Sequence, residues 1–205
     1  MENLFKLSED GKTLIKVLSR ILNHITIPSG VEVIGEEAFA HYKVLLSVDI
    51  PETVTTIEEY AFYGCSSLQS INIPNSVTTI EGCVFVDCTS LTNVTIGTGA
   101  TLIHVAAFNG CESLTNVIVD EGNEIYRSIE GNLYSKDGKT LVKYAIGKEQ
   151  ASFTVPEQVE TIGEFAFADC SNLVRIIIQD NVRSINVSAF NSCHSIMEVF
   201  YTDSQ

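Results

Sequence analysis

One pattern of apolar residues returns every 23 residues, and it constrains the fold of this chain more than any other feature. Residues 54–74 read VTTIEEYAFYGCSSLQSINIP, and residues 77–97 read VTTIEGCVFVDCTSLTNVTIG. Self-similarity with a period in the twenties is typical of a solenoid made of leucine-rich repeats. Because a single repeat cannot bury its own apolar residues, neighbouring repeats must stack as coils and cover one another.

The repeat occurs six times and is interrupted once. The six copies begin at Val31, Val54, Val77, Ala100, Val159 and Val182. Between residues 120 and 152 the period breaks, and Asp137-Gly138-Lys139-Thr140-Leu141 repeats the letters of residues 10–14. The strand-like segment 153–156 echoes segment 25–28, so a larger unit of hairpin, strand and repeats occurs twice. Asp-Gly between β-favouring residues predicts a hairpin in each unit, near residues 5–17 and 126–148. For residues 14–22 a short helix is an open alternative.

The spacing changes character within each repeat. Ile71 and Ile73 alternate with polar residues, as in a strand with one buried face. Ile57, Ala61 and Cys65 are four residues apart, which suits a short helical turn. We therefore expect a β-rich solenoid with helical turns and eight parallel strands, centred near Ile25, Val48, Ile71, Val94, Val117, Phe153, Ile176 and Val199.

The expected organisation is one solenoid domain spanning residues 1–205. It comprises a hairpin cap unit (1–28), four repeats (29–119), a hairpin insertion unit (120–156) and two further repeats (157–205). The last strand, near residues 198–201, would have no following coil. The chain is therefore expected either to be cut from a longer protein or to self-associate through this C-terminal edge.

The frame V-x-x-I-x-x-x-A-F-x-x-C-x-x-L-x-x-I-x-I-P resembles the BspA-like leucine-rich repeat family. The resemblance rests on the Ala-Phe pairs, the recurrent Cys and the Ile-x-Ile-Pro strands, with the aromatic positions at Phe39, Phe62, Phe108, Phe167 and Phe190. It implies a curved right-handed solenoid with a concave parallel sheet and a convex side of short strands and helical turns. It also implies a microbial cell-surface or secreted protein used in adhesion or host contact, an inference that follows the fold and needs support from a site.

The charge balance excludes several partners. The chain has 12 Lys plus Arg against 26 Asp plus Glu, for a net charge of -14, and no Lys or Arg lies between Lys43 and Arg127. Nucleic acid binding needs such residues to neutralise phosphates, so neither nucleic acid nor an anionic membrane surface is expected as a partner. No apolar run is long enough for membrane insertion. The first residues, MENLFKLSEDGKT, lack the pattern of a signal peptide, so either the protein is cytoplasmic or a secretion signal lies outside this sequence.

Neither catalysis nor metal binding is indicated. Five of the six cysteines share one repeat position, where neighbouring coils would bring their Cα atoms within reach of a disulfide. Because free Cys also packs as a small hydrophobe, we expect buried, reduced thiols. There is no CxxC pair, phosphate loop or nucleophile motif, so we expect no enzyme, no cofactor and no metal. Glu58, Glu81 and His104 share another repeat position and are interpreted as a solvated column, with a cation site as the alternative.

The predicted function is protein binding on the concave sheet. In each strand the apolar pair points inward, so the residue before the pair and the one between its two members point outward. Outward apolar and Arg residues are typical of interface anchors, because folding explains them poorly. The candidate binding residues are Asn72, Asn93, Thr95, Asn116, Ile118, Arg175, Ile177 and Phe200. The expected partner is a protein, including a host or matrix protein. Alternatives are a carbohydrate-binding module, a structural spacer, or a sheet whose outward residues are covered by hairpin 126–148 or by a further coil.

Overall fold

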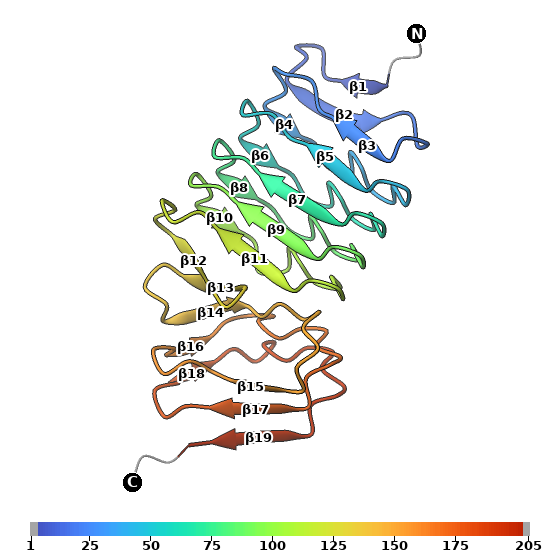
Figure 1. Cartoon of the computed structure of the whole chain (residues 1–205). Helices are drawn as coiled ribbons and strands as arrows, with labels where there is room; N and C mark the ends of the chain where they lie inside the picture. The colour runs from blue at the N-terminus through green and yellow to red at the C-terminus, as the bar shows by residue number, and fades with distance from the viewer. Residues whose placement is uncertain (1–3, 203–205) are drawn as a thin grey trace.

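The chain winds into a stack of coils, and each coil contributes one longer strand to the same side of the stack. The computed structural model describes residues 4–202; the outermost residues of the predicted cap unit and last repeat, 1–3 and 203–205, lie outside them. All eight strand positions predicted from the sequence are strands (Figure 1): β3 (His24–Thr26), β5 (Ser47–Asp49), β7 (Ser70–Ile73), β9 (Asn93–Ile96), β11 (Asn116–Val119), β15 (Ser152–Thr154), β17 (Arg175–Ile178) and β19 (Glu198–Tyr201). We call the surface formed by these strands the long-strand face.

The strands of the long-strand face pair in parallel but not as one continuous sheet. They form the pair β3–β5 and the sheets β7–β9–β11 and β15–β17–β19. The register advances by one repeat at each step, so Ile71 lies beside Val94 and Val94 beside Val117. This constant register explains why the same apolar pair is buried in successive coils.

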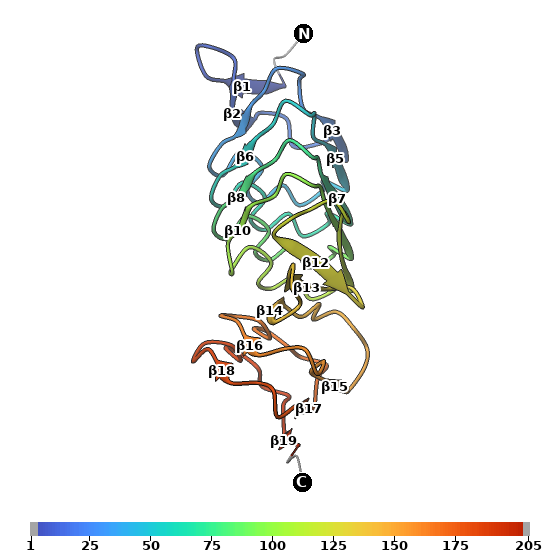
Figure 2. The ribbon, with the colours of Figure 1, turned by 90° about the vertical axis from the view of Figure 1, so that its left-hand side faces the viewer.

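Short strands line the opposite side of the coils (Figure 2). In the first block they are β4 (Val33–Ile34), β6 (Thr56–Ile57), β8 (Thr79–Ile80) and β10 (Leu102–Ile103), and in the second block β16 (Thr161–Ile162) and β18 (Ser184–Ile185). In each block the row of short strands begins beside a hairpin. The predicted N-terminal hairpin is confirmed as β1 (Phe5–Leu7) and β2 (Thr13–Val17), and β2 pairs in parallel with β4. A helix over residues 14–22, the alternative, is wrong.

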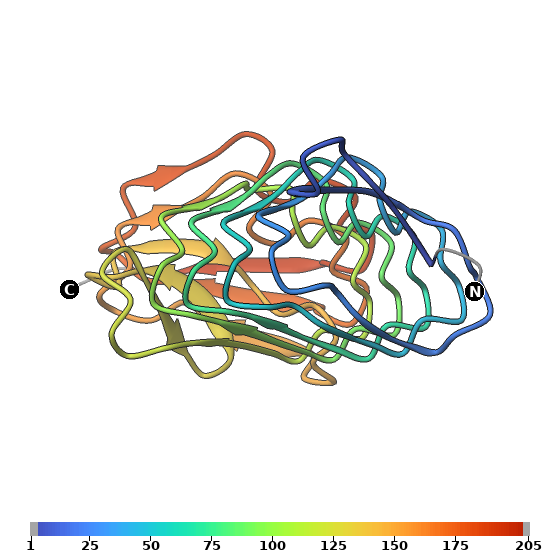
Figure 3. The same cartoon turned by 90° about the horizontal axis from the view of Figure 1, so that it is seen from above.

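The insertion is larger than a hairpin. It forms an antiparallel meander of β12 (Tyr126–Ile129), β13 (Asn132–Ser135) and β14 (Thr140–Lys143), and β14 pairs in parallel with β16. The turn between β13 and β14 matches the one between β1 and β2: Ser135 donates to Asp137 at 2.7 Å, as Ser8 donates to Asp10 at 2.6 Å. Viewed down the stack, successive coils are displaced relative to one another, as in a superhelix (Figure 3).

The predicted helical turns are wrong, because no helix occurs among residues 4–202. Hydrogen bonds explain why. Ala38 and Ala40 donate their N–H groups to carbonyls three residues back, at 3.1 Å each, whereas Phe39 donates to Ala61 in the next coil at 2.8 Å. Glu37, whose carbonyl accepts the Ala40 N–H, has a left-handed φ of 55°. The segment is a ribbon of β-turns that gives every second N–H to its neighbour. Such a ribbon also buries residues four apart, so the helical spacing misled the prediction.

A column of phenylalanines runs through the interior. Phe62 stacks on Phe39 at 4.6 Å and on Phe85 at 5.4 Å between ring centroids, and Phe85 stacks on Phe108 at 5.5 Å. In the second block Phe167 stacks on Phe190 at 5.1 Å. The buried apolar residues form two clusters that divide at the insertion, where the side chain of Tyr144 lies 5.3 Å from Phe167. Stacking of equivalent side chains is what a constant repeat makes possible.

Candidate binding face

The outward residues of the long-strand face divide into two groups. In β7, Ile71 and Ile73 are 3% and 1% exposed, whereas Ser70 before them and Asn72 between them are exposed. The same alternation holds in β9, β11 and β17, and the register of β19 places Phe200 beside Ile177. All the candidate binding residues therefore lie on the outer side, fully or partly accessible to solvent. Their placement is as predicted, but whether they bind a partner is a separate question.

The first group is a polar surface over β7, β9 and β11. Asn72, Thr95 and Ile118 lie in one row across these strands, and Asn93 and Asn116 lie in the next row. The amide of Asn116 donates to Asn93 Oδ1 at 3.3 Å. Ile118 is the last residue of its row, and 49% of its surface is exposed. The other two residues of that row, Asn72 and Thr95, are polar. This surface therefore has hydrogen-bonding amides with one apolar side chain at its edge.

The second group is a compact anchor cluster over β17 and β19, which we define as Arg175, Ile177, Glu198 and Phe200. Arg175 lies beside Glu198 in register, and its Nη2 and Nε atoms are each 2.6 Å from Glu198 Oε2. The guanidinium carbon lies 5.2 Å from the ring centroid of Phe200, which is 48% exposed and lies beside Ile177. Cation–π packing and the ion pair hold the arginine in place before any partner arrives.

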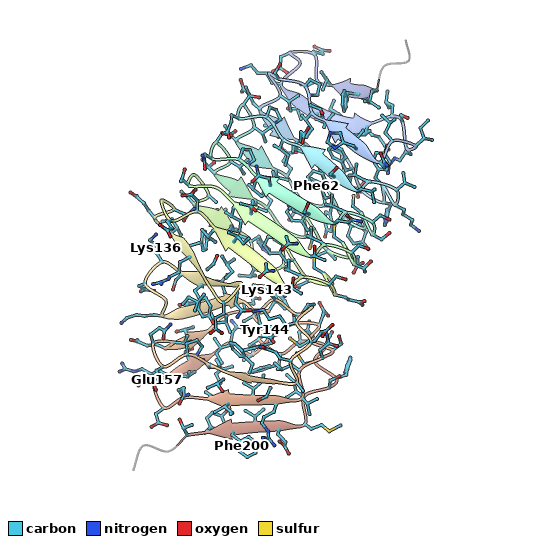
Figure 4. The ribbon with its side chains drawn as sticks, in the orientation of Figure 1. Phe62, Lys136, Lys143, Tyr144, Glu157 and Phe200 are labelled. Carbon is cyan, nitrogen blue, oxygen red and sulfur yellow. The ribbon has the colours of Figure 1, made fainter. Side chains whose placement is uncertain are left out.

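The structure does not bring the two groups together. The insertion lies between them, with β12 and β13 packed beside β11 (Figure 4). It does not cover the exposed anchors, because Ile118 and Phe200 remain about half exposed, at 49% and 48%. Covering by the hairpin, one alternative drawn from the sequence, is therefore wrong for these two residues.

Sequence reasoning missed the grooves on either side of the insertion. One open groove of about 500 Å³ has Ile118 at its wall together with Arg127 and Lys136. The other, also about 500 Å³, is lined by residues that include Glu130, Ser152 and Phe153. A signal for the first groove was present, since basic residues resume at Arg127 after a long stretch without any. The insertion therefore supplies the positive charge that residues 44–126 lack.

The cysteines pack as interior residues. All six are free, and the thiols of Cys65, Cys88 and Cys111 each donate to a phenylalanine carbonyl of the preceding coil, at 3.2, 3.2 and 3.1 Å. Burial raises the pKa of Cys65 and of Cys111 to about 12, so both are protonated at neutral pH. Cys193 differs, because a hydrogen bond with the Cys170 thiol lowers its pKa and because it is only partly buried.

The short-strand side has an acidic groove but no assembled cation site. Glu36, Glu58, Glu59 and Glu81 line an open hollow of about 260 Å³. Glu58 accepts the backbone N–H of Glu36 at 3.0 Å, and His104 accepts the N–H of Ala106 at 3.2 Å. In residues 4–202, no three His, Cys, Asp or Glu side chains gather as metal ligands would. Nor does any described segment form an apolar helix of membrane-spanning length.

Comparison with known proteins identifies the fold. The solved structures similar to this chain include the pneumococcal vaccine antigen PcpA, with a TM-score of 0.68 and 22% identity over 96% of this chain and 53% of that one. A leucine-rich repeat protein of Eubacterium ventriosum has a TM-score of 0.69 and 20% identity over 94% of this chain and 66% of that one. A leucine-rich repeat protein of T. pallidum has a TM-score of 0.55 and 20% identity, covering 96% and 79%. The chain thus spans 53% and 66% of the first two relatives.

No curated protein matches the sequence. A family model for the BspA type leucine-rich repeat region matches it in 6 copies, over residues 18–136 and 145–205. These matches take in the repeated frame and the stacked strands described above. The chain belongs to the BspA-type leucine-rich repeat family.

Proposed function

We propose that this chain is a non-enzymatic protein-binding module of a microbial cell-surface or secreted adhesion protein. Residues 1–205 would act as one solenoid domain with the division into cap, repeats and insertion given above. The observation that carries the proposal is the anchor cluster, in which an arginine, an isoleucine and a phenylalanine point outward from a sheet. Binding hot spots are enriched in arginine and aromatic residues.

The partner we propose is a host or matrix protein that binds across the long-strand face. Arg175 and Phe200 are already held against each other, so little side-chain entropy is lost when a partner covers them. On the other side of the insertion, the amides of Asn72, Asn93 and Asn116, with Thr95, supply hydrogen bonds, and Ile118 supplies a second apolar contact. A mixture of polar and apolar contacts is the usual composition of a non-obligate protein interface.

Two other functions remain as alternatives with less support. A carbohydrate-binding module would present a bare aromatic ring for a sugar to stack on, but Arg175 lies over the ring of Phe200. A structural spacer would need no outward anchors at all. The C-terminal edge is a further surface for self-association, since Val199 and Tyr201 are 45% and 67% exposed on β19.

The test is a double variant, Arg175→Ala with Ile177→Ser, in a binding assay against a panel of purified host and matrix proteins. We expect binding to weaken by about 1–2 kcal/mol or more, with an unchanged melting curve. The matched control is Glu58→Gln with Glu81→Gln on the short-strand side. Unchanged affinity in the first variant with a loss in the second would place the site on the opposite face. A positive glycan array with a negative protein panel would favour carbohydrate binding, and two negative results would favour the spacer.

A further inference from the structure

The chain contains one internal joint, where a hairpin unit stacks on the end of a block of repeats. Its centre is Lys143 of β14, which is 1% exposed and lies between the blocks (Figure 4). Its Nζ atom donates to Asn109 Oδ1 at 2.8 Å and to the Phe165 carbonyl at 3.1 Å. A buried ammonium is costly unless it is hydrogen-bonded, and Asn109 belongs to the last coil of the first block. The lysine–asparagine contact therefore ties the second block to the first.

The hairpin unit of this joint has a counterpart at the start of the chain. The repeated letters Asp-Gly-Lys-Thr-Leu align β14 with β2, and they place Lys16 where the second unit has Lys143. They also place Leu18 where the second unit has Ala145. Lys143 and Ala145 are 1% and 0% exposed, whereas Lys16 is exposed and Leu18 is 53% exposed. The first hairpin unit thus leaves open the surface that the second unit buries in the joint.

The receiving side of the joint also has a counterpart, at the last coil. The residue that matches Asn109 there is Asn191, whereas the other four coils carry Ala40, Tyr63, Val86 and Ala168 at this position. Among the six coils, an amide stands at this position only in the fourth and the sixth. The long strands of the two coils differ in exposure in the same way. Val117 and Val119, beneath the joint, are 0% and 8% exposed, whereas the equivalent residues Val199 and Tyr201 are 45% and 67% exposed.

We propose that copies of this chain associate head to tail, with hairpin β1–β2 of one copy on the last coil of another and Lys16 Nζ donating to Asn191 Oδ1 across the contact. This association specifies the self-association through the C-terminal edge that is part of the proposed function, and it rests on that part. The contact is heterologous, so each dimer keeps one free head and one free tail and can extend.

Charge favours this orientation. Residues 6–20 contain four of the chain's 12 basic residues and two acidic residues, Glu9 and Asp10, so this segment carries a net charge of 4 − 2 = +2, whereas the whole chain carries -14. The head is therefore a weakly basic end of an acidic molecule, and electrostatic repulsion disfavours the approach of two heads.

One difference makes the contact between copies weaker than the internal joint. Gly147 brings its main chain onto the first block, and a Cβ there would lie 2.2 Å from the carbonyl carbon of Ser113. At the head, Ser19 and Arg20 stand in this region, so the second copy cannot approach as closely. Strand β12, which covers β11 beside the joint, has no counterpart in the described part of the first unit. We expect a dissociation constant on the order of 10–500 µM rather than a permanent dimer.

Sedimentation velocity over a concentration series, from about 5 µM to about 1 mM, tests the contact. The average mass should rise with concentration. Lys16→Ala and Asn191→Ala should each lower the association constant about tenfold, because a hydrogen bond from a charged group is lost. Lys43→Ala, which removes an exposed lysine outside the hairpin, is the matched control and should change nothing.

Mixing two blocked variants tests the orientation. Leu18→Asp blocks the head and Tyr201→Asp blocks the tail, so each alone should stay monomeric. Their equimolar mixture should form a dimer of one copy of each and nothing larger, because the remaining head and tail are both blocked.

Three outcomes would overturn the proposal. A wild type that is monomeric throughout removes self-association altogether. Self-association that survives Leu18→Asp but not Tyr201→Asp means that tails bind tails. Association insensitive to Lys16→Ala and Asn191→Ala means that another contact joins the copies. None of these results alters binding of a matrix protein through Arg175 and Ile177, so failure here is distinguishable from failure of the main proposed function.

Discussion

The phenylalanine column of the first block predicts that a substitution inside it costs far more than the same substitution at Phe190, which ends the shorter column of the second block. Phe62 is 0% exposed and stacks on two rings, whereas Phe190 is only partly buried and stacks on one. Phe62→Ala removes a buried ring and leaves a cavity, at a cost of about 3–5 kcal/mol in known cores. Two lost aromatic pairs place it near the upper end of that range, at about 5 kcal/mol. For Phe190→Ala, the partial burial of the ring and a single aromatic pair give about 2 kcal/mol.

Urea unfolding followed by far-ultraviolet circular dichroism measures the difference. Phe62→Leu is the matched control, because it keeps most of the apolar volume and loses only the ring contacts, for about 2 kcal/mol. Amide exchange should accelerate chiefly in the coils on either side of residue 62, since each coil contacts only its neighbours. If Phe62→Ala and Phe190→Ala differ by less than about 1 kcal/mol, stacking on two rings adds little to the stability of the coils.

Three further predictions concern titrating groups. Burial lowers the pKa of Lys143 from its ordinary value of 10.5. Between the lowered value and 10.5 the unfolded chain binds more protons than the folded chain, so the free energy of unfolding rises with pH. In urea midpoints measured along a pH series, Lys143→Met should lack this rise. Under native conditions iodoacetamide should modify Cys193 before the buried Cys65, and all six thiols should react in denaturant without reductant; two or more missing would contradict free cysteines. Hydrogen bonds from Ser135 and from the Lys139 N–H lower the pKa of Asp137, so its contribution is present above 3.8 and is lost as pH falls through the lowered folded value. Asp137→Asn should flatten that part of the acid unfolding curve, and an unchanged curve would count against it.

The apolar frame was enough to predict the stack of coils, because strands such as β7 and β9 bury the same positions at the same spacing. It could not distinguish a helical turn from the β-turn ribbon at Phe39, since both bury residues four apart. That choice depends on hydrogen bonds to the next coil, which exist only once the coils have stacked.

The candidate site was predictable only in part. Alternation placed Asn72 and Phe200 on the outer side of the sheet, but it could not show that the insertion separates them. Lys143 was missed because a lysine is almost never fully buried without partners, and its partner Asn109 lies 34 residues away in sequence. The match between Asn109 and Asn191 has a structural meaning only because Asn109 accepts a hydrogen bond from Lys143 in the joint.

The hydrogen bonds between coils also give the molecule a mechanical character. They run along the stack, from each strand to the next, as between β7, β9 and β11. A force that pulls the two ends apart therefore loads them in tension, one coil at a time, rather than shearing many together. Each coil that peels away would release 23 residues, or about 75 Å of extended chain. Under load such a stack lengthens in uniform steps while the coils behind the break keep their shape.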